Sequence, residues 1–162
     1  MSKCAGIFPV FDNGKTVLLG KEYRERYDAM LWMSFGGKQD PNESLAETAC
    51  REFNEETAFV FRLDVQRVID AENLGHYIDY LNPKTGVFYR MYIVSFSEKP
   101  DISEFLKSRQ FYPEFVEKIE WKYFRTRDVI FDTLGAEFAI YETEKVRYNL
   151  LKDAQFFKHL LI

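Results

Sequence analysis

The 162-residue chain has ample material for one compact core, since 46% of its residues are hydrophobic and 17% are aromatic. Its formal net charge of −4 argues against charge-driven attraction to long nucleic acid, and its two cysteines do not resemble a disulfide framework. With no bilayer-length apolar run and no signal-peptide pattern, we expect one domain over residues 1–162, no membrane contact, and a cytoplasmic or otherwise intracellular setting.

The N-terminal part of the chain predicts a β-hairpin. Apolar runs over residues 5–11 and 16–19 flank the turn-forming sequence DNG at residues 12–14. The chain then passes Trp32 and reaches residues 37–43, which predict a loop because Asp-Pro-Asn at residues 40–42 favours a turn.

A helix is expected to begin near Ser44. Ser44 and Glu47 have the spacing of a capping box, in which each side chain accepts a hydrogen bond from the other residue's backbone amide. The residues that follow form an apolar stripe at helical spacing, suited to packing against a core: Leu45, Ala46, Ala49, Cys50 and Phe53.

Three carboxylates crowd the end of this helix. Glu52, Glu55 and Glu56 are related as i, i+3 and i+4, so they repel one another and oppose the helix dipole unless something positive offsets them. Most charge runs are solvated faces, but Glu56 falls at the edge of the apolar stripe. Oxygen-only ligands in such a cluster suit hard divalent cations such as Mg²⁺ or Mn²⁺.

The second half of the chain predicts more strands and a final helix. Strand-forming residues are frequent over residues 59–69, 87–96 and 116–124, the last of which contains Trp121. The final helix is predicted by apolar residues that recur every three or four positions: Val146, Leu150, Ala154, Phe157 and Leu161. Two helices around a mixed β-sheet give an α/β fold.

Residues 37–59 resemble the Nudix box, G-x5-E-x7-R-E-U-x-E-E-x-G-U, where U is a bulky apolar residue. Every specified position matches except the last glycine, which is Ala58. A left-handed backbone at that point would cost alanine about 1 kcal/mol, so either the chain bears that strain or the helix ends by another route. The resemblance implies a Nudix-like α/β/α sandwich around a mixed β-sheet and a hydrolase of phosphoanhydrides.

The resemblance also implies roles for the box residues. Glu52 and Glu56 would be direct metal ligands, and Glu55 would be a third ligand or the base that takes a proton from water. Gly37 would bring its carbonyl close to the metal, because it lacks a side chain. The metal, Mg²⁺ or Mn²⁺, would neutralise phosphate charge and lower the pKa of bound water.

Arg51 would orient a carboxylate, and Glu43 would pair with Arg51 to hold the loop. Similar enzymes often add a carboxylate from outside the box, and we expect Glu117 to supply it, ahead of Glu114 and Glu120. Four further residues are candidates for substrate contact, two basic ones for phosphates and two aromatic ones for stacking on a base, although surface solubility and core packing explain such residues equally well: Lys38, Arg24, Trp32 and Tyr77.

The function that these features imply is metal-dependent hydrolysis of a nucleoside diphosphate linked to another group, such as a nucleotide polyphosphate, a dinucleotide or a nucleotide sugar. Capped RNA ends and diphosphoinositol compounds are alternative substrates. A non-catalytic nucleotide-binding module is a different class, disfavoured because the box keeps all its glutamates. A homodimer stays open, since the Phe-rich residues 131–138 suit an interface and a core equally.

Overall fold

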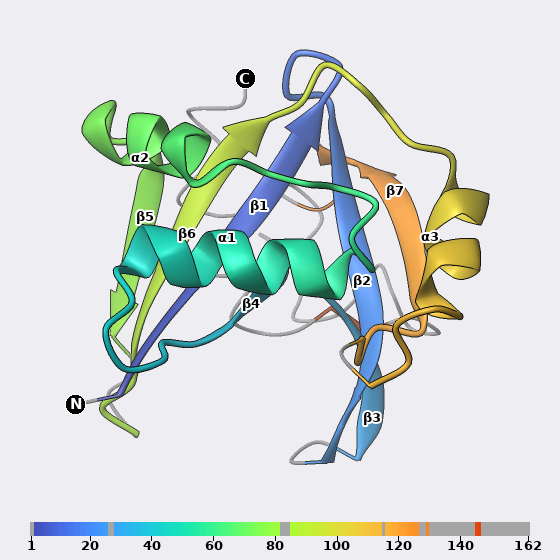
Figure 1. Cartoon of the computed structure of the whole chain (residues 1–162), viewed down its shortest axis with the longest axis horizontal. Coiled ribbons are helices and arrows are strands. Elements are labelled where there is room, and N and C mark those ends of the chain that lie inside the picture. Colours follow the sequence, from blue (N-terminus) through green and yellow to red (C-terminus); the bar gives the residue numbers. More distant parts are fainter. Residues whose placement is uncertain are drawn as a thin grey trace.

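The computed structural model describes residues 2–25, 28–81, 85–114, 116–126, 129 and 145–146. Three helices in this part of the chain flank one mixed β-sheet: α1 (Leu45–Glu56), α2 (Val65–Asn73) and α3 (Ile102–Arg109) (Figure 1). The strands are β1 (Lys3–Phe11), β2 (Thr16–Arg24), β3 (Ala29–Met33), β4 (Phe35–Lys38), β5 (Tyr77–Leu81), β6 (Phe88–Ser95), β7 (Glu120–Arg125) and β8 (Lys145–Val146).

Strand β1 organises the sheet. It pairs in parallel with β6 on one edge, and its other edge is divided between two antiparallel partners. The first part of β1 pairs with β4, from Cys4 opposite Lys38 to Ile7 opposite Phe35, and its end pairs with β2 at Val10 opposite Val17. Strand β2 also pairs with β7 over residues 16–21 and with β3 over residues 20–24. Because β2 pairs only with the end of β1, β4 can lie beside the first part of β1. The chain then continues from β4 directly into the loop before α1.

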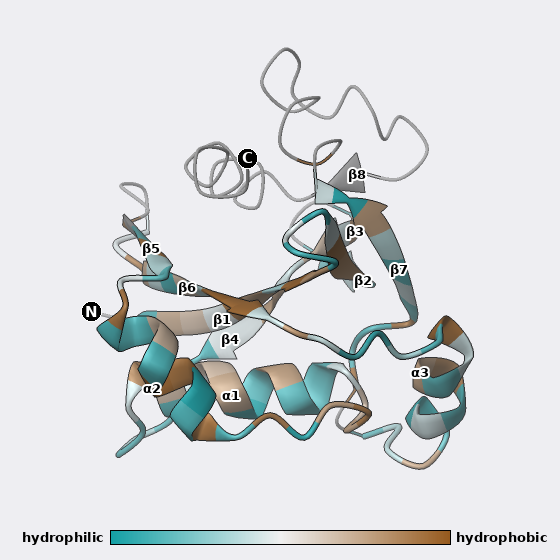
Figure 2. Ribbon diagram, turned by 90° about the horizontal axis from the view of Figure 1, so that it is seen from above, coloured by the Kyte–Doolittle hydropathy of each residue, from teal (hydrophilic) through white to brown (hydrophobic). Residues whose placement is uncertain are grey.

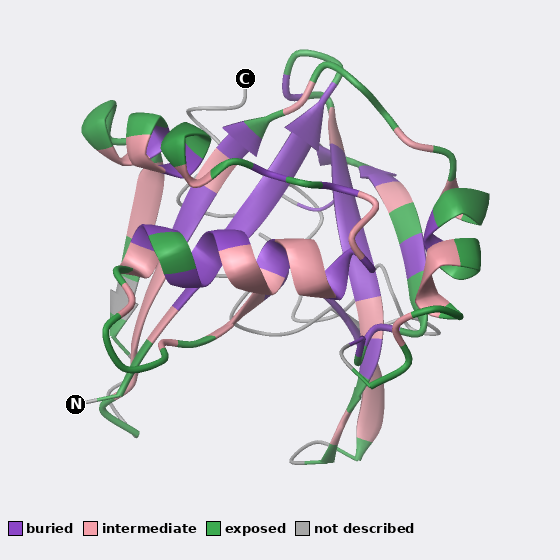
Figure 3. Ribbon diagram, in the orientation of Figure 1, coloured by how far each residue is buried: buried purple, intermediate pink, exposed green. Residues whose placement is uncertain are grey.

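Buried apolar side chains lie on both faces of the sheet because the strand residues alternate in direction. Ile7 and Leu18 belong to the cluster that α1 and α2 cover, whereas Phe8 and Leu19 belong to a second cluster on the opposite face. The views in Figures 2 and 3 show α1 and α2 lying against one face of the sheet with their buried residues toward it. None of the described helices combines the length and apolarity that a lipid bilayer would require.

Several sequence-based expectations are confirmed. The hairpin forms with its turn at residues 12–14, and the strand expected at residues 87–96 is β6. Helix α1 begins as expected: Ser44 is its N-cap, and both hydrogen bonds of the capping box with Glu47 are present.

Two predicted strands need correction. Residues 59–64 form turns and loop, and residues 65–73 are helix α2, because Asp64 caps the Gln66 amide and Val68 and Ala71 recur at helical spacing to face the core. Strand β7 starts only at Glu120, so the prediction of a strand from residue 116 was too early.

The predicted C-terminal helix is wrong at its first residue, since Val146 belongs to strand β8. The remaining residues of that helix lie outside the described part of the chain, as does the Phe-rich segment 131–138.

At the end of α1, Ala58 occupies the position of the glycine in the Nudix box and adopts the backbone conformation expected of that glycine. Ala58 and Phe59 both adopt the left-handed backbone, with φ of 54° and 59°. The strain of about 1 kcal/mol at Ala58 is offset locally, because the indole N–H of Trp121 donates to the carbonyl of Glu56 at 3.0 Å and the hydroxyl of Ser108 donates to the carbonyl of Ala58. The helix therefore ends where the box would have it end, without the glycine.

Candidate active site

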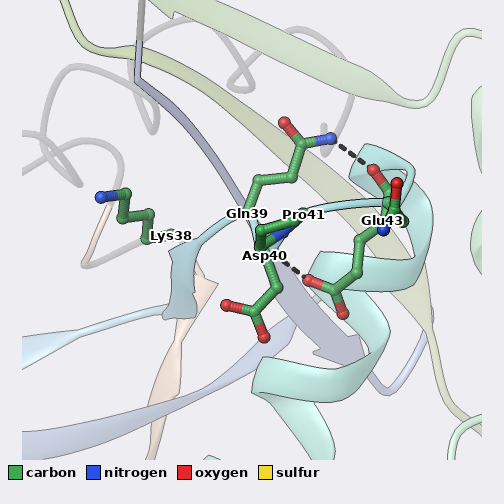
Figure 4. A pocket seen from close by; sticks show the side chains of 6 residues that line it. Lys38, Gln39, Asp40, Pro41 and Glu43 are labelled. Atoms are coloured by element: carbon green, nitrogen blue, oxygen red, sulfur yellow. Dashed lines mark hydrogen bonds between the residues drawn. The ribbon is translucent and has the colours of Figure 1, made fainter.

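The loop between β4 and α1 is held by Glu43. Its carboxylate accepts a hydrogen bond from the backbone amide of Asp40 at 2.9 Å and one from the hydroxyl of Thr48 at 3.1 Å. The side-chain amide of Gln39 donates to the backbone carbonyl of Glu43 at 2.6 Å (Figure 4). Two of these contacts close the loop on itself, and the one with Thr48 ties it to the first turn of α1.

Arg51 connects this loop to the glutamates of α1. Its guanidinium donates two hydrogen bonds to Glu43, from Nε at 2.7 Å and from Nη2 at 2.9 Å. Nη1 donates to Glu52 at 2.9 Å and lies 3.5 Å from the carboxylate of Glu55. The bonds from Arg51 lower the pKa of Glu43 to about 2, so Glu43 is ionised at any pH at which the protein would work.

Gly37 lies directly against the carboxylate of Glu52. A Cβ atom at residue 37 would sit 2.5 Å from the carboxylate carbon, so a side chain there would have to displace the Glu52 carboxylate. Burial raises the pKa of Glu52, Arg51 lowers it, and the neighbouring Glu55 and Glu117 raise it further. The backbone of β4 and this carboxylate are therefore in close contact, as the expected role of Gly37 requires.

Glu56 points inward, unlike the other two glutamates. Only 5% of the residue is exposed, and its Oε1 accepts a hydrogen bond from the backbone amide of Gly36 at 2.6 Å. Its Oε2 lies 3.7 Å from the ammonium nitrogen of Lys118. Burial raises the pKa of Glu56 to about 8, although Lys118 opposes the shift.

The expected convergence of three glutamates on one point is thus not what the structure shows. Glu52 and Glu55 turn toward Arg51, while Glu56 turns toward Gly36 and Lys118. Among the described residues, no three His, Cys, Asp or Glu side chains lie together in a ready-made metal-binding group. The physical reason is that side-chain cations neutralise the clustered carboxylates, as such a charge run requires.

Sequence reasoning missed Lys118 and Glu22. Lys118 is completely buried, and its ammonium donates to Glu22 at 2.6 Å. Glu22 is 3% exposed, and although burial acts to raise its pKa, Lys118 and Arg24 lower it below the ordinary value. The only signal in the sequence was a charged residue inside the strand-forming run of β2, which does not reveal a partner 96 residues away.

Two residues predicted from outside the box do lie near these carboxylates. Glu117 is a neighbour of Glu22, and its pKa is raised by burial and by the hydrogen bond that the two carboxyl groups share. Arg24 lies 3.6 Å from the carboxylate of Glu22. Glu117 and Arg24 are therefore placed beside the buried pair of Glu22 and Lys118.

The other three predicted contact residues lie elsewhere. The side chain of Lys38 extends away from Asp40 and Glu43 (Figure 4). Trp32 is fully buried, packed edge-to-face against Phe124 at 5.2 Å between ring centroids, so its ring offers no open face to a base. Tyr77 lies on edge strand β5, where the guanidinium of Arg90 stacks at 4.0 Å from its ring centroid.

The donor set fits a hard divalent cation in kind, because it consists of carboxylate and carbonyl oxygens at the junction of β4 and α1. Gly37 makes room for the Glu52 carboxylate. The residues that would hold the cation are Glu52, Glu56 and Gly37, with Glu55 as a third ligand or as the base that takes a proton from water. To bind it together, Glu52 and Glu55 have to share or exchange the contacts that they make with Arg51.

Solved structures share this fold. Among many matches, the C. elegans Ap4A hydrolase aligns over 97% of this chain and 97% of its own, with 19% identity and a TM-score of 0.55. The E. coli ORF135 protein aligns over 99% of this chain and 91% of its own, with 14% identity and a TM-score of 0.55. A MutT/nudix family protein from Enterococcus faecalis aligns over 76% of this chain with 18% identity and a TM-score of 0.51, and the chain spans 43% of that protein. No curated protein sequence matches.

The loop–helix unit, with its glutamate-bound arginine and its three glutamates, carries the residues of the Nudix box. The family model described as the NUDIX domain matches residues 2–140. The chain therefore belongs to the NUDIX family and is a Nudix hydrolase, a class of enzymes that generally use divalent metal ions.

Proposed function

We propose that this protein hydrolyses a phosphoanhydride bond in a nucleoside diphosphate linked to another group, and that Mg²⁺ or Mn²⁺ is required. The observation that carries the proposal is the network of Arg51, which joins Glu43 of the loop to Glu52 and Glu55 of α1 within hydrogen-bonding or ion-pair distance. A network of this kind orders the carboxylates that would hold metal and water.

Each residue of the network has a distinct task. Glu43 fixes the guanidinium through two parallel bonds, and Arg51 in turn orients Glu52 and Glu55. Glu55 is the base that takes a proton from the attacking water, because 27% of its side chain is exposed whereas those of Glu52 and Glu56 are 18% and 7% exposed. The divalent cation supplies charge neutralisation on the phosphates and a bound water of lowered pKa.

In this proposal the substrate binds on the solvent-exposed side of these carboxylates. Arg24 is about one-third exposed beside Glu22 and Glu117, and we propose that it receives a phosphate group. The named activity of the C. elegans relative suggests dinucleoside polyphosphates as the first compounds to test. Glu117 is proposed as the additional carboxylate, since its charge acts on Glu52.

The test is product analysis over a panel of dinucleoside polyphosphates, nucleotide sugars, deoxynucleoside triphosphates, capped RNA and diphosphoinositol compounds, with and without Mg²⁺ or Mn²⁺. We expect metal-dependent cleavage of a nucleotide compound, with turnover reduced about a hundredfold or more in Glu55→Gln. Glu47→Gln is the matched control, because Glu47 is exposed at the other end of α1 and glutamine also completes a capping box.

Two outcomes would contradict the proposal. Cleavage only of capped RNA or of diphosphoinositols would replace the proposed substrate class. Tight nucleotide binding without metal-dependent product from any compound would instead indicate a non-catalytic module.

A further inference from the structure

Lys118 has a charged side chain that is completely buried beside two glutamates, Glu22 and Glu56. None of it is exposed, and three oxygens surround its ammonium nitrogen: Glu22 Oε1 at 2.6 Å, the Ser34 carbonyl at 3.3 Å and Glu56 Oε2 at 3.7 Å. The nitrogen also lies 5.5 Å from the ring centroid of Phe35. A buried ammonium is tolerated only when such partners replace its lost hydration.

The surrounding backbone is shaped to receive this lysine. The aliphatic part of Lys118 passes over Gly20, where a Cβ atom would lie 2.6 Å from its Cδ. The carbonyl of Lys118 accepts a hydrogen bond from Nε of Arg109 at 2.8 Å, and the amide of Ile119 donates to the carbonyl of Lys21 at 2.8 Å. Strand β2 and the end of helix α3 therefore fix both the stem and the backbone of Lys118.

The ammonium lies in a position that would suit a small cation. Two carboxylate oxygens and one backbone carbonyl face it, which are the oxygen donors that hard divalent ions prefer. Glu56 links this position to strand β4, since its other oxygen accepts a hydrogen bond from the backbone amide of Gly36.

We propose that Lys118 is a built-in cation of the metal site: its ammonium group positions Glu56 against Glu22 and excludes a divalent ion from the space between them. Divalent ions then bind only on the outer side, where Glu52, Glu55 and Gly37 lie and where Glu56 contributes its remaining lone pairs. This inference rests on the proposed function. Lys118 is a positioning residue, because it acts through Glu56.

The test counts Mn²⁺ ions bound without substrate, by calorimetry and by electron paramagnetic resonance of free Mn²⁺. Lys118→Met keeps the aliphatic stem but removes the charge, so we expect about one additional Mn²⁺ per chain, or Mn²⁺ affinity at least about tenfold higher. Lys118→Met combined with Glu22→Gln should lose this gain. Lys122→Met is the matched control, because it changes the net charge equally from an exposed position on β7 and should bind Mn²⁺ as the unmodified protein does.

A folded Lys118→Met protein with the Mn²⁺ stoichiometry and affinity of the unmodified protein would overturn the inference. If that variant does not unfold cooperatively and is therefore not properly folded, a measurement on the unmodified protein tests the inference instead. The ¹⁵N signal of the Lys118 ammonium should persist at saturating Mg²⁺, whereas its loss to solvent exchange would show that Mg²⁺ displaces the lysine and would also overturn the inference.

The two proposals fail separately. A chain that gains Mn²⁺ when Lys118 is replaced, yet cleaves no compound in the panel, contradicts the proposed function and leaves the role of Lys118 standing. A chain that cleaves nucleotides but shows the same Mn²⁺ binding in both forms contradicts only the role of Lys118.

Discussion

Arg51 and Lys118 both neutralise glutamates of helix α1, but they do so in different surroundings. Arg51 is 28% exposed and uses its planar guanidinium to bind several oxygens at once. Lys118 is completely buried and places a single charge between Glu22 and Glu56. The comparison shows two uses of positive charge: a fork that fixes directions at the open side of the site, and a point charge that offsets buried carboxylates on its inner side.

The largest expected effect is at Glu56, where the two sides meet. Glu56→Gln should lower turnover by about a hundredfold or more, because a neutral amide is a poor metal ligand. The fold should persist, since the amide oxygen can still accept from Gly36 and Lys118 keeps its bond to Glu22. Turnover and thermal unfolding of the same preparation check both parts. Near-normal turnover would remove Glu56 from the catalytic site.

The next largest effect is expected when lysine replaces Arg51, because a single ammonium group then takes the place of the planar guanidinium. Arg51→Lys keeps the charge but cannot make two parallel bonds to Glu43 while also reaching Glu52. We expect turnover to fall about 10- to 100-fold and the free energy of unfolding to fall by about 1–3 kcal/mol. Arg62→Lys, at an exposed position, is the control. If Arg51→Lys keeps full activity, only the charge at Arg51 matters, and its planar geometry is not needed.

The pairing of Glu43 with Arg51 should appear in the pH dependence of stability. Because the folded protein lowers the pKa of Glu43 from 4.5 to about 2, the ionised form stabilises the fold. That contribution is complete above the unfolded-state pKa of 4.5 and is lost as the pH falls toward 2. Glu43→Gln should therefore cost about 2 kcal/mol at neutral pH and progressively less below pH 4.5, measured by urea unfolding. A difference that does not change with pH would refute the assignment.

The smallest expected effect is at the end of α1. Ala58→Gly relieves a left-handed backbone worth about 1 kcal/mol but removes a fully buried methyl group worth about 0.8 kcal/mol. The free energy of unfolding and the turnover should both change little. A stabilisation of several kcal/mol would show that the bonds from Trp121 and Ser108 do not offset the strain.

Features that depend on neighbouring residues were predictable. The start of α1 at Ser44 follows from a capping box of four residues. The contact of Glu43 with Arg51, which the resemblance to the Nudix box implied, is also present. The strand predicted over residues 59–69 was wrong, because an apolar run of that length suits a strand and a half-buried helix alike. Asp64 caps the first turn and stabilises the helix.

Features that join distant segments were not predictable. Trp32 is buried against Phe124, although an aromatic residue near the box equally suggested a stacking surface. The separation of Glu56 from Glu52 and Glu55 also depends on tertiary contacts, since all three share the last turns of one helix and only Gly36 and Lys118 draw Glu56 inward.

The sequence by itself determined the helix and its cap, because these depend on residues a few positions apart whose spacing fixes their geometry, and the resemblance to the Nudix box implied the arginine fork and the family. Only the tertiary structure decided the inner side of the site. Glu22, Lys118 and Glu56 come from β2, the segment before β7 and α1. The pairing of β2 with β7 brings Glu22 and Lys118 together, and the packing of α1 on the sheet adds Glu56. Burial then makes each of these charges depend on the others, which no local pattern records.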